Sequence, residues 1–109
     1  MIVEIVRPFP TTPFDFIKLQ NGMYVLFDPK WLYALSTLHW YAKKSRGLFY
    51  ACAKVKIGGR FRFLRMHRIV AHTPEDMIAH HINGNTLDNR SANLQNMNRF
   101  EHAKLYSYW

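Results

Sequence analysis

Apolar and polar residues alternate in short runs along most of this chain, and turn-forming residues separate the runs. Between Phe14 and Phe27, two runs rich in β-branched and aromatic residues flank Asn21-Gly22. Because this dipeptide readily adopts the positive φ angles of a type I′ turn, the pattern predicts a β-hairpin. Residues 1–6 also alternate weakly and predict a strand, which ends before the proline-containing segment that starts at Pro8.

Apolar residues change to helical spacing between Lys30 and Leu38, where they are Trp31, Leu32, Leu35 and Leu38. Asp28 is placed to cap a helix at this point and Pro29 suits its first turn, so a short helix is predicted. Residues 43–47, which follow, are predicted to form a basic loop.

A second hairpin is predicted from Leu48 to Met66, around Gly58-Gly59. Cations alternate with apolar residues in its strands, so each strand has one basic and one apolar face; these cations are Lys54, Lys56, Arg60 and Arg62. A two-residue turn would pair Ile57 with Arg60 and mix the faces, whereas a three-residue loop would pair Lys56 with Arg60. We therefore expect the three-residue loop with a glycine bulge, an apolar face in the core and a cationic strip outside.

The last third of the chain predicts short helices and strands in succession. A helix is expected from Met66 to His72, and strands from Met77 to His81 and from Leu94 to Asn96, with a loop between the strands. Asn98 followed by Glu101 is a capping-box pattern, which predicts that a further helix begins there. The expected fold class is therefore α+β, with small antiparallel hairpins, short helices and a C-terminal strand, loop, strand and helix.

Composition limits the size and the partners of this protein. At 109 residues the chain suits one domain with a single core, made of a β-rich portion (1–65) and a C-terminal portion (66–109). Fifteen Lys and Arg against seven Asp and Glu give a net charge of +8 and a pI near 9.9. This charge suits a polyanion such as nucleic acid or an anionic membrane surface, although solubility alone would also account for it.

Cysteine content and apolar runs exclude several classes of protein. Cys52 is the single cysteine, which excludes an intramolecular disulfide and a zinc site built from a cysteine cluster. No apolar run is long enough to cross a bilayer, and the N-terminus lacks the pattern of a signal peptide. We therefore expect an intracellular, cytoplasmic protein with no membrane partner.

The richest pattern of polar residues extends from His80 to His102. His80-His81 is followed by Asn83-Gly84 and Asp88-Asn89-Arg90; Asn93 comes twelve residues after His81, and His102 nine residues after Asn93. This pattern resembles the motif of the HNH endonucleases. The upstream His67-Arg68, followed by apolar residues, is similar to the segment that precedes the motif in many phage and intron-type members.

The resemblance implies a ββα-metal core that hydrolyses phosphodiester bonds of DNA. His81 would be the general base, because an imidazole with a pKa of about 6.5 accepts a proton at neutral pH. His80 and His102 would hold one divalent ion, and this requires the strand to end or bend at His81, since neighbouring residues in a strand point to opposite faces. Asn93 would tie the two strands together and fix the loop.

The two imidazoles bear on the choice of metal ion. Many members of the family have Asp where this chain has His80, and Asn where it has His102. The family implies Mg²⁺ or Mn²⁺, but imidazole ligands favour Mn²⁺, Co²⁺, Ni²⁺ or Zn²⁺ over Mg²⁺, which prefers oxygen.

Further residues are assigned to DNA contact or to support of the site. The expected DNA contacts are cations, namely Lys54, Lys56, Arg60, Arg62, Arg68, Arg90 and Arg99. For the hairpin cations a solvated face is the alternative, and for Arg68 a structural hydrogen bond. The expected supporting residues are Asp88 and Asn89, as hydrogen-bonding loop residues, and His67, as a buried hydrogen-bonded imidazole.

Three functions are compatible with these observations. The first is an HNH-type DNA endonuclease with weak sequence preference, which nicks as a monomer and needs a weak homodimer or two events to break both strands. The second is a non-catalytic nucleic-acid-binding module with a structural or vestigial metal site, and the third a small metal-binding protein-interaction domain. Homing, phage DNA processing in a host cell, degradation of host DNA and activity on RNA all stay open.

Overall fold

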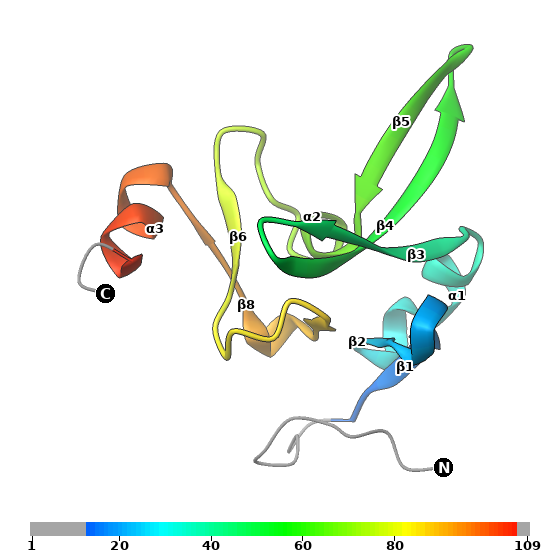
Figure 1. The fold of residues 1–109 in the computed structure, drawn as a ribbon, viewed down its shortest axis with the longest axis horizontal. Coiled ribbons are helices and arrows are strands. Elements are labelled where there is room, and N and C mark those ends of the chain that lie inside the picture. Colours follow the sequence, from blue (N-terminus) through cyan, green and yellow to red (C-terminus); the bar gives the residue numbers. More distant parts are fainter. Residues whose placement is uncertain (1–12, 107–109) are drawn as a thin grey trace.

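Three small β-sheets and several short helices make up the computed structural model, which describes residues 13–106 and is of the α+β class expected (Figure 1). The strand predicted over residues 1–6 and the prolines Pro8 and Pro10 lie outside the described residues. No helix in the described part of the chain is long and apolar enough to cross a membrane.

The first sheet contains β1 (Asp15–Lys18), β2 (Tyr24–Phe27) and β7 (Asp88–Asn89). β1 and β2 are antiparallel, and the type I′ turn predicted between them forms in the 3₁₀ segment Gln20–Gly22: the φ angles of Asn21 and Gly22 are 61° and 73°. β7 pairs with β2 in parallel, with Phe27 opposite Asn89. This pairing was not expected, and it joins the two portions of the chain.

The predicted helix after β2 is shorter than expected and is capped differently. It consists of a 3₁₀ turn (Pro29–Trp31) and α1 (Leu32–Ser36). Asp28 occupies the N-cap position but makes no side-chain bond to the helix. Its carboxylate instead accepts hydrogen bonds from the backbone N–H of Ser91, at 3.0 Å, and from the Ser91 hydroxyl. Asp28 therefore connects α1 to the C-terminal portion.

The second sheet is an antiparallel meander of β3 (Trp40–Ser45), β4 (Leu48–Ile57) and β5 (Arg60–Arg65). The basic loop predicted over 43–47 is wrong: its first three residues belong to β3, and Arg46-Gly47 alone forms the turn, with φ angles of 51° and 83°. Positive φ at both positions matches the twist of the flanking strands, as a two-residue hairpin turn requires.

The β4–β5 hairpin also differs from the predicted register. Gly58 and Gly59 form a two-residue turn, with φ angles of 57° and 77°, and Ile57 lies opposite Arg60. The predicted three-residue loop and the separation into a basic and an apolar face are therefore wrong. The reason is that, within residues 13–106, no other element covers the outer half of the hairpin, which projects from the molecule (Figure 1), so a wholly apolar face would have no core to join.

The C-terminal portion follows the predicted order of elements. It contains α2 (Met66–Val70), β6 (Ile78–His81), a 3₁₀ turn (Ser91–Asn93), β8 (Leu94–Met97) and α3 (Arg99–Tyr106). β6 and β8 pair antiparallel. The predicted capping box is confirmed: the Glu101 N–H donates to Asn98 Oδ1 at 2.8 Å, and the Asn98 N–H donates to Glu101 Oε1 at 3.1 Å. These bonds fix the start of α3, and the helix lies beside β6.

One hydrophobic core joins the first two sheets and α2. Its buried members come from β2, α1, β3, β4 and α2, and include Val25, Phe27, Leu35, Trp40, Ala51, Ala53, Met66 and Val70. Thr86 donates its hydroxyl hydrogen to the carbonyl of Phe49 and so holds the loop after β6 against β4. The shared core and these contacts place the edge of the β3–β4 turn against the end of β6.

Candidate functional site

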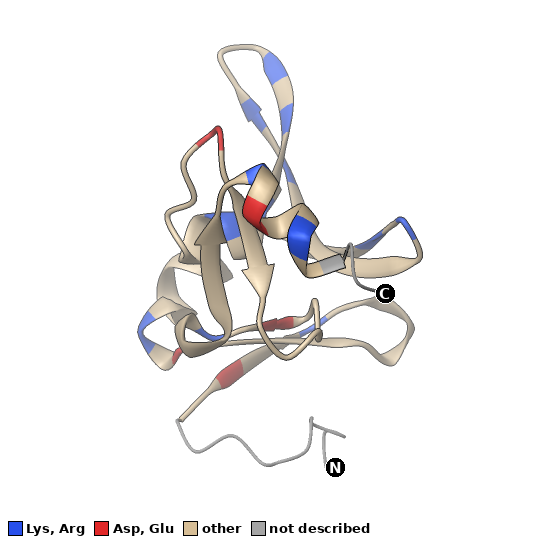
Figure 2. Ribbon diagram, turned by 90° about the vertical axis from the view of Figure 1, so that its left-hand side faces the viewer, with Lys and Arg blue, Asp and Glu red and all other residues tan. Residues whose placement is uncertain are grey.

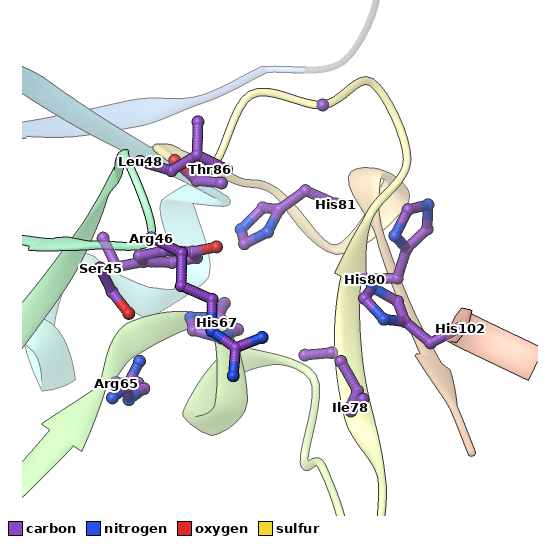
Figure 3. Close-up of a pocket in the computed structure, with 13 residues that line it drawn as sticks. Ser45, Arg46, Leu48, Arg65, His67, Ile78, His80, His81, Thr86 and His102 are labelled. Carbon is purple, nitrogen blue, oxygen red and sulfur yellow. The ribbon is translucent and has the colours of Figure 1, made fainter. Parts of the chain in front are cut away.

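A pocket of about 360 Å³ lies between the β3–β4 turn, α2, β6 and the start of α3 (Figure 3). All three histidines of the motif line it, although His81 and His80 alternate along β6. His81 is buried and projects towards His67, whereas His80 lies on the other side of the strand beside His102. β6 ends directly after His81, where the Gly84 N–H donates to the His81 carbonyl at 3.0 Å. The pocket therefore reaches both sides of the strand end.

His81 is oriented by a buried amide. Its Nε2 lies 2.7 Å from Oδ1 of Asn89, which is on β7. Because an amide oxygen only accepts hydrogen bonds, Nε2 carries the hydrogen of the neutral ring, and Nδ1 keeps the lone pair. Burial lowers the pKa of His81, partly opposed by the Asn89 hydrogen bond and the Asp88 charge, and the His80 charge lowers it further. The neutral ring with a basic Nδ1 is thus favoured at neutral pH.

A second buried imidazole lies behind His81. The ring centres of His67 and His81 are 5.0 Å apart, and that of Tyr50 is 5.5 Å from His67. Burial first, and then the charges of His81, Arg65 and Arg68, lower the pKa of His67 to about 3. His67 is buried as expected, but its Nδ1 has no hydrogen-bond partner among the described residues. The buried ring beside His81 is therefore the uncharged imidazole of His67.

His80 and His102 form a pair of imidazoles at the other side of the pocket. Their ring centres are 5.4 Å apart and the rings are inclined by 71°. Two imidazole nitrogens about 2 Å from one metal ion bring the ring centres to about 5 Å, so the distance between these rings is compatible with a shared divalent ion. Burial, and then the charge of His102, lower the pKa of His80, which favours the neutral form that binds metal. No group of three or more His, Cys, Asp or Glu suited to a metal occurs within residues 13–106.

Asn93 ties the loop after β6 to the start of β7. Its Nδ2 donates to the Asp88 carbonyl at 2.9 Å, and its Oδ1 accepts from the Asn83 N–H at 2.9 Å. The Ile82 N–H donates to the Asn93 carbonyl at 2.8 Å. Asn93 thereby holds the turn that follows His81, but it is 6% exposed and does not line the pocket.

Arg90, expected as a DNA contact, forms an ion pair within the fold. Its Nε and Nη2 donate to the two carboxylate oxygens of Asp88, at 2.8 and 2.6 Å, and both residues are buried. Asn83 Nδ2 also donates to Asp88, at 2.9 Å. The Asp88 hydrogen bond raises the pKa of Arg90, so the guanidinium stays charged. A guanidinium that binds a buried carboxylate is less available to a phosphate, and the contact of Arg90 with DNA stays a prediction.

The other expected DNA contacts lie in different environments. Arg68 donates to the carbonyls of Met77 and Pro74, at 2.8 and 2.9 Å, which supports the structural alternative. Arg99 is exposed at the start of α3. The four hairpin cations are exposed but outside the pocket, and they are Lys54, Lys56, Arg60 and Arg62.

The pocket contains two cations that the sequence analysis did not assign to the site. Arg46, in the β3–β4 turn, and Arg65, at the end of β5, both line it, and no Asp or Glu is among the described residues that do so. Figure 3 shows the Arg46 side chain extending between the β3–β4 turn and β6. The sequence does contain a signal for these two cations, because no acidic residue that could pair with them occurs between Asp28 and Glu75. The result is a pocket suited to an anion.

Comparisons of this chain with protein-family models, with curated proteins and with solved structures give no match.

Proposed function

We propose that this protein is a metal-dependent DNA endonuclease of the HNH type. The observation that carries the proposal is the His81–Asn89 hydrogen bond of 2.7 Å, which leaves a basic Nδ1 on a neutral imidazole in a pocket also lined by His80 and His102. A neutral imidazole that can accept a proton, a pair of imidazoles that can bind a metal ion, and cations in a pocket that no described Asp or Glu lines are the groups that hydrolysis of a phosphodiester needs. The spacing of the motif residues supports the same assignment.

In the proposed reaction, Arg46 and Arg65 bind the non-bridging oxygens of the scissile phosphate and orient it within the pocket. A water molecule on the His81 side loses a proton to Nδ1 of His81 as its oxygen attacks phosphorus. The imidazolium that forms keeps its Nε2–H bond to Asn89, and the Asp88 carboxylate favours its positive charge. The bond from phosphorus to the 3′ oxygen breaks, and the departing 3′ oxygen takes a proton from solvent, which leaves a 5′ phosphate and a 3′ hydroxyl; the imidazolium of His81 then returns its proton to solvent.

His80 and His102 would hold one divalent ion. Bound there, the ion would supply a positive charge that polarises the phosphate and neutralises the leaving oxygen. Both ligands from the protein are imidazoles, so we propose that Mn²⁺, Co²⁺, Ni²⁺ or Zn²⁺ binds more tightly than Mg²⁺. A single site of this kind cuts one strand in each encounter, and we expect nicking by the monomer with weak sequence preference.

The alternative is a nucleic-acid-binding module without activity, and the exposed cationic hairpin outside the pocket favours it. Conversion of supercoiled plasmid to nicked and linear forms, with Mg²⁺, Mn²⁺, Ni²⁺ or EDTA, separates the two functions. His81→Ala should slow cutting by about 10²–10⁴-fold, the usual contribution of a general base. His39→Ala is the matched control, because His39 is exposed and does not line the pocket.

Two results are decisive. Cutting that requires a metal ion and is lost in His81→Ala but kept in His39→Ala would support the nuclease. Binding of the plasmid by the wild type and both variants, with no cutting under any ion, would replace it by the binding module.

A further inference from the structure

The register of the second sheet places aromatic and cationic side chains together on the face that leads to the pocket. Residues directly opposite one another in antiparallel strands share a face, as do alternate residues of one strand. Lys56 lies opposite Phe61, and Lys54 opposite Phe63. Lys43 of β3 lies opposite Tyr50, which is on the same face. We call these five residues the cation–aromatic strip: Lys43, Lys54, Lys56, Phe61 and Phe63.

The strip continues into the candidate site. Tyr50 precedes Lys54 on the same face of β4, and Arg65 follows Phe63 on the same face of β5. Both Tyr50 and Arg65 line the pocket that contains His81. A chain-like ligand could therefore contact the pocket and the strip without crossing the sheet.

Both phenylalanines of the strip are accessible. The exposed fraction is 60% for Phe61 and 55% for Phe63. The ammonium group of Lys54 is 4.3 Å from the ring centre of Phe61, and that of Lys43 is 4.7 Å from the ring centre of Phe63. Figure 2 shows Lys and Arg along this hairpin and no Asp or Glu. Exposed aromatic rings that project on a hairpin among cations point to a ligand that has both anionic and aromatic groups.

We propose that the strip binds an unpaired DNA strand, with bases stacked on Phe61 and Phe63 and phosphates near the three lysines. Duplex DNA presents phosphates but keeps the faces of its bases stacked inside, so it would leave both rings unused. An unpaired strand presents both groups, and stacking on a ring accepts any base. Base stacking is stronger than a surface cation–π contact, so an incoming base can displace the ammonium group, which then moves to a phosphate.

This inference deepens the proposed function and rests on it for one point, the cleavage of the strand that the strip binds. The substrate class would be single-stranded DNA or duplex DNA with an unpaired segment, such as a flap or a bubble. The strand would run from the strip past Tyr50 and Arg65 to His81.

Binding can be measured apart from cleavage with the full chain carrying His81→Ala. Fluorescence anisotropy would compare a labelled oligonucleotide with the duplex that it forms with its complement. The single strand should bind at least about tenfold more tightly. Phe61→Leu and Phe63→Leu, which keep an apolar side chain but remove the ring, should each weaken single-strand binding by about five- to a hundredfold. Duplex binding should change little.

A matched control and a salt series complete the test. Ile57→Ala removes a comparable exposed apolar side chain, 56% exposed, from the opposite face of the hairpin, and should leave both affinities unchanged. Lys54→Gln should weaken binding and reduce its dependence on salt, because one phosphate contact is lost. Thermal unfolding of each variant checks that the fold is retained.

Equal affinity for single strand and duplex would overturn the inference, as would Phe→Leu variants that bind the single strand like the parent. A failure of the nuclease proposal looks different. If single-strand binding depends on Phe61 but the wild type cuts no plasmid, oligonucleotide or flap, the strip is supported and the endonuclease is not. If the wild type cuts plasmid with no preference for unpaired DNA, the endonuclease is supported and the strip is not.

Discussion

Acidification should destabilise this protein through His67. The imidazole is buried, and its pKa in the folded protein is lowered to about 3 from 6.5. In the unfolded chain His67 takes up a proton below pH 6.5, whereas the folded protein does not do so until the pH approaches 3. The unfolded state therefore binds more protons in this interval, so the free energy of unfolding falls as the pH falls from 6.5 towards 3.

The loss of unfolding free energy can be calculated from the change in the pKa of His67 between the unfolded and the folded protein. Each unit of difference in pKa corresponds to about 1.4 kcal/mol, so His67 alone should cost about 2 kcal/mol between pH 7.5 and pH 5, and about 4 kcal/mol by pH 3. This is a large part of the roughly 5–15 kcal/mol that stabilises a typical domain. Burial also lowers the pKa values of His80 and His81, which adds loss of stability in the same direction.

Comparison with His67→Phe isolates the contribution of His67, because phenylalanine keeps a ring in the buried site and does not titrate. Urea unfolding, followed by tryptophan fluorescence at several pH values, gives the free energy of unfolding for each protein. Between pH 7.5 and pH 5 the wild type should lose about 2 kcal/mol more than His67→Phe. His39→Gln, at an exposed position, should follow the wild type. Parallel pH curves for the wild type and His67→Phe would refute the reasoning.

Three further substitutions test the site. Asn89→Leu should populate both neutral tautomers of His81 and slow cleavage by about 10–100-fold. The ¹⁵N chemical shifts of the His81 ring measure the tautomers, and an unchanged spectrum would contradict the role of Asn89 in orienting His81. His102→Asn should move the metal preference towards Mg²⁺, and the activity measured with each metal ion tests this. If Mg²⁺ already supported the highest activity of the wild type, and His102→Asn changed nothing, the proposed preference for Mn²⁺, Co²⁺, Ni²⁺ or Zn²⁺ would be contradicted. Asp88→Asn should destabilise the fold by about 3–5 kcal/mol because it removes the buried carboxylate that accepts two hydrogen bonds from the Arg90 guanidinium. Urea unfolding measures this loss, and a change below about 1 kcal/mol would exclude a structural ion pair.

Local signals in the sequence predicted the elements that short-range hydrogen bonds define. Asn21-Gly22 predicted a type I′ turn, and the chain between Gln20 and Met23 closes in that way, with a Met23 N–H to Gln20 carbonyl hydrogen bond of 3.3 Å. Asn98 and Glu101 predicted the start of α3, because a capping box needs only residues that are three positions apart. The histidine spacing likewise led to a strand and a helix that bring His80 and His102 together.

Tertiary contacts decided how the same residues are used. The sequence predicted Asp28 as a helix cap, but the partner of its carboxylate is Ser91, sixty-three positions away. It predicted Asp88 as a hydrogen-bonding loop residue and Arg90 as a DNA contact, and the fold pairs the two with each other. The pairing of β7 with β2 buries Asn89 beside His81, so the orientation of the proposed base depends on two strands that are distant in sequence.

The sequence by itself determined the α+β class, most of the short elements and the order of the motif residues, because these depend on backbone preferences and contacts within a few residues. The tertiary structure alone decided the register of the β4–β5 hairpin, the burial of Arg90 and the entry of Arg46 and Arg65 into the pocket. The local sequence does not decide whether a cationic side chain contacts a carboxylate, an aromatic ring, a phosphate or water. Which of these it meets depends on the segments that the fold brings against it.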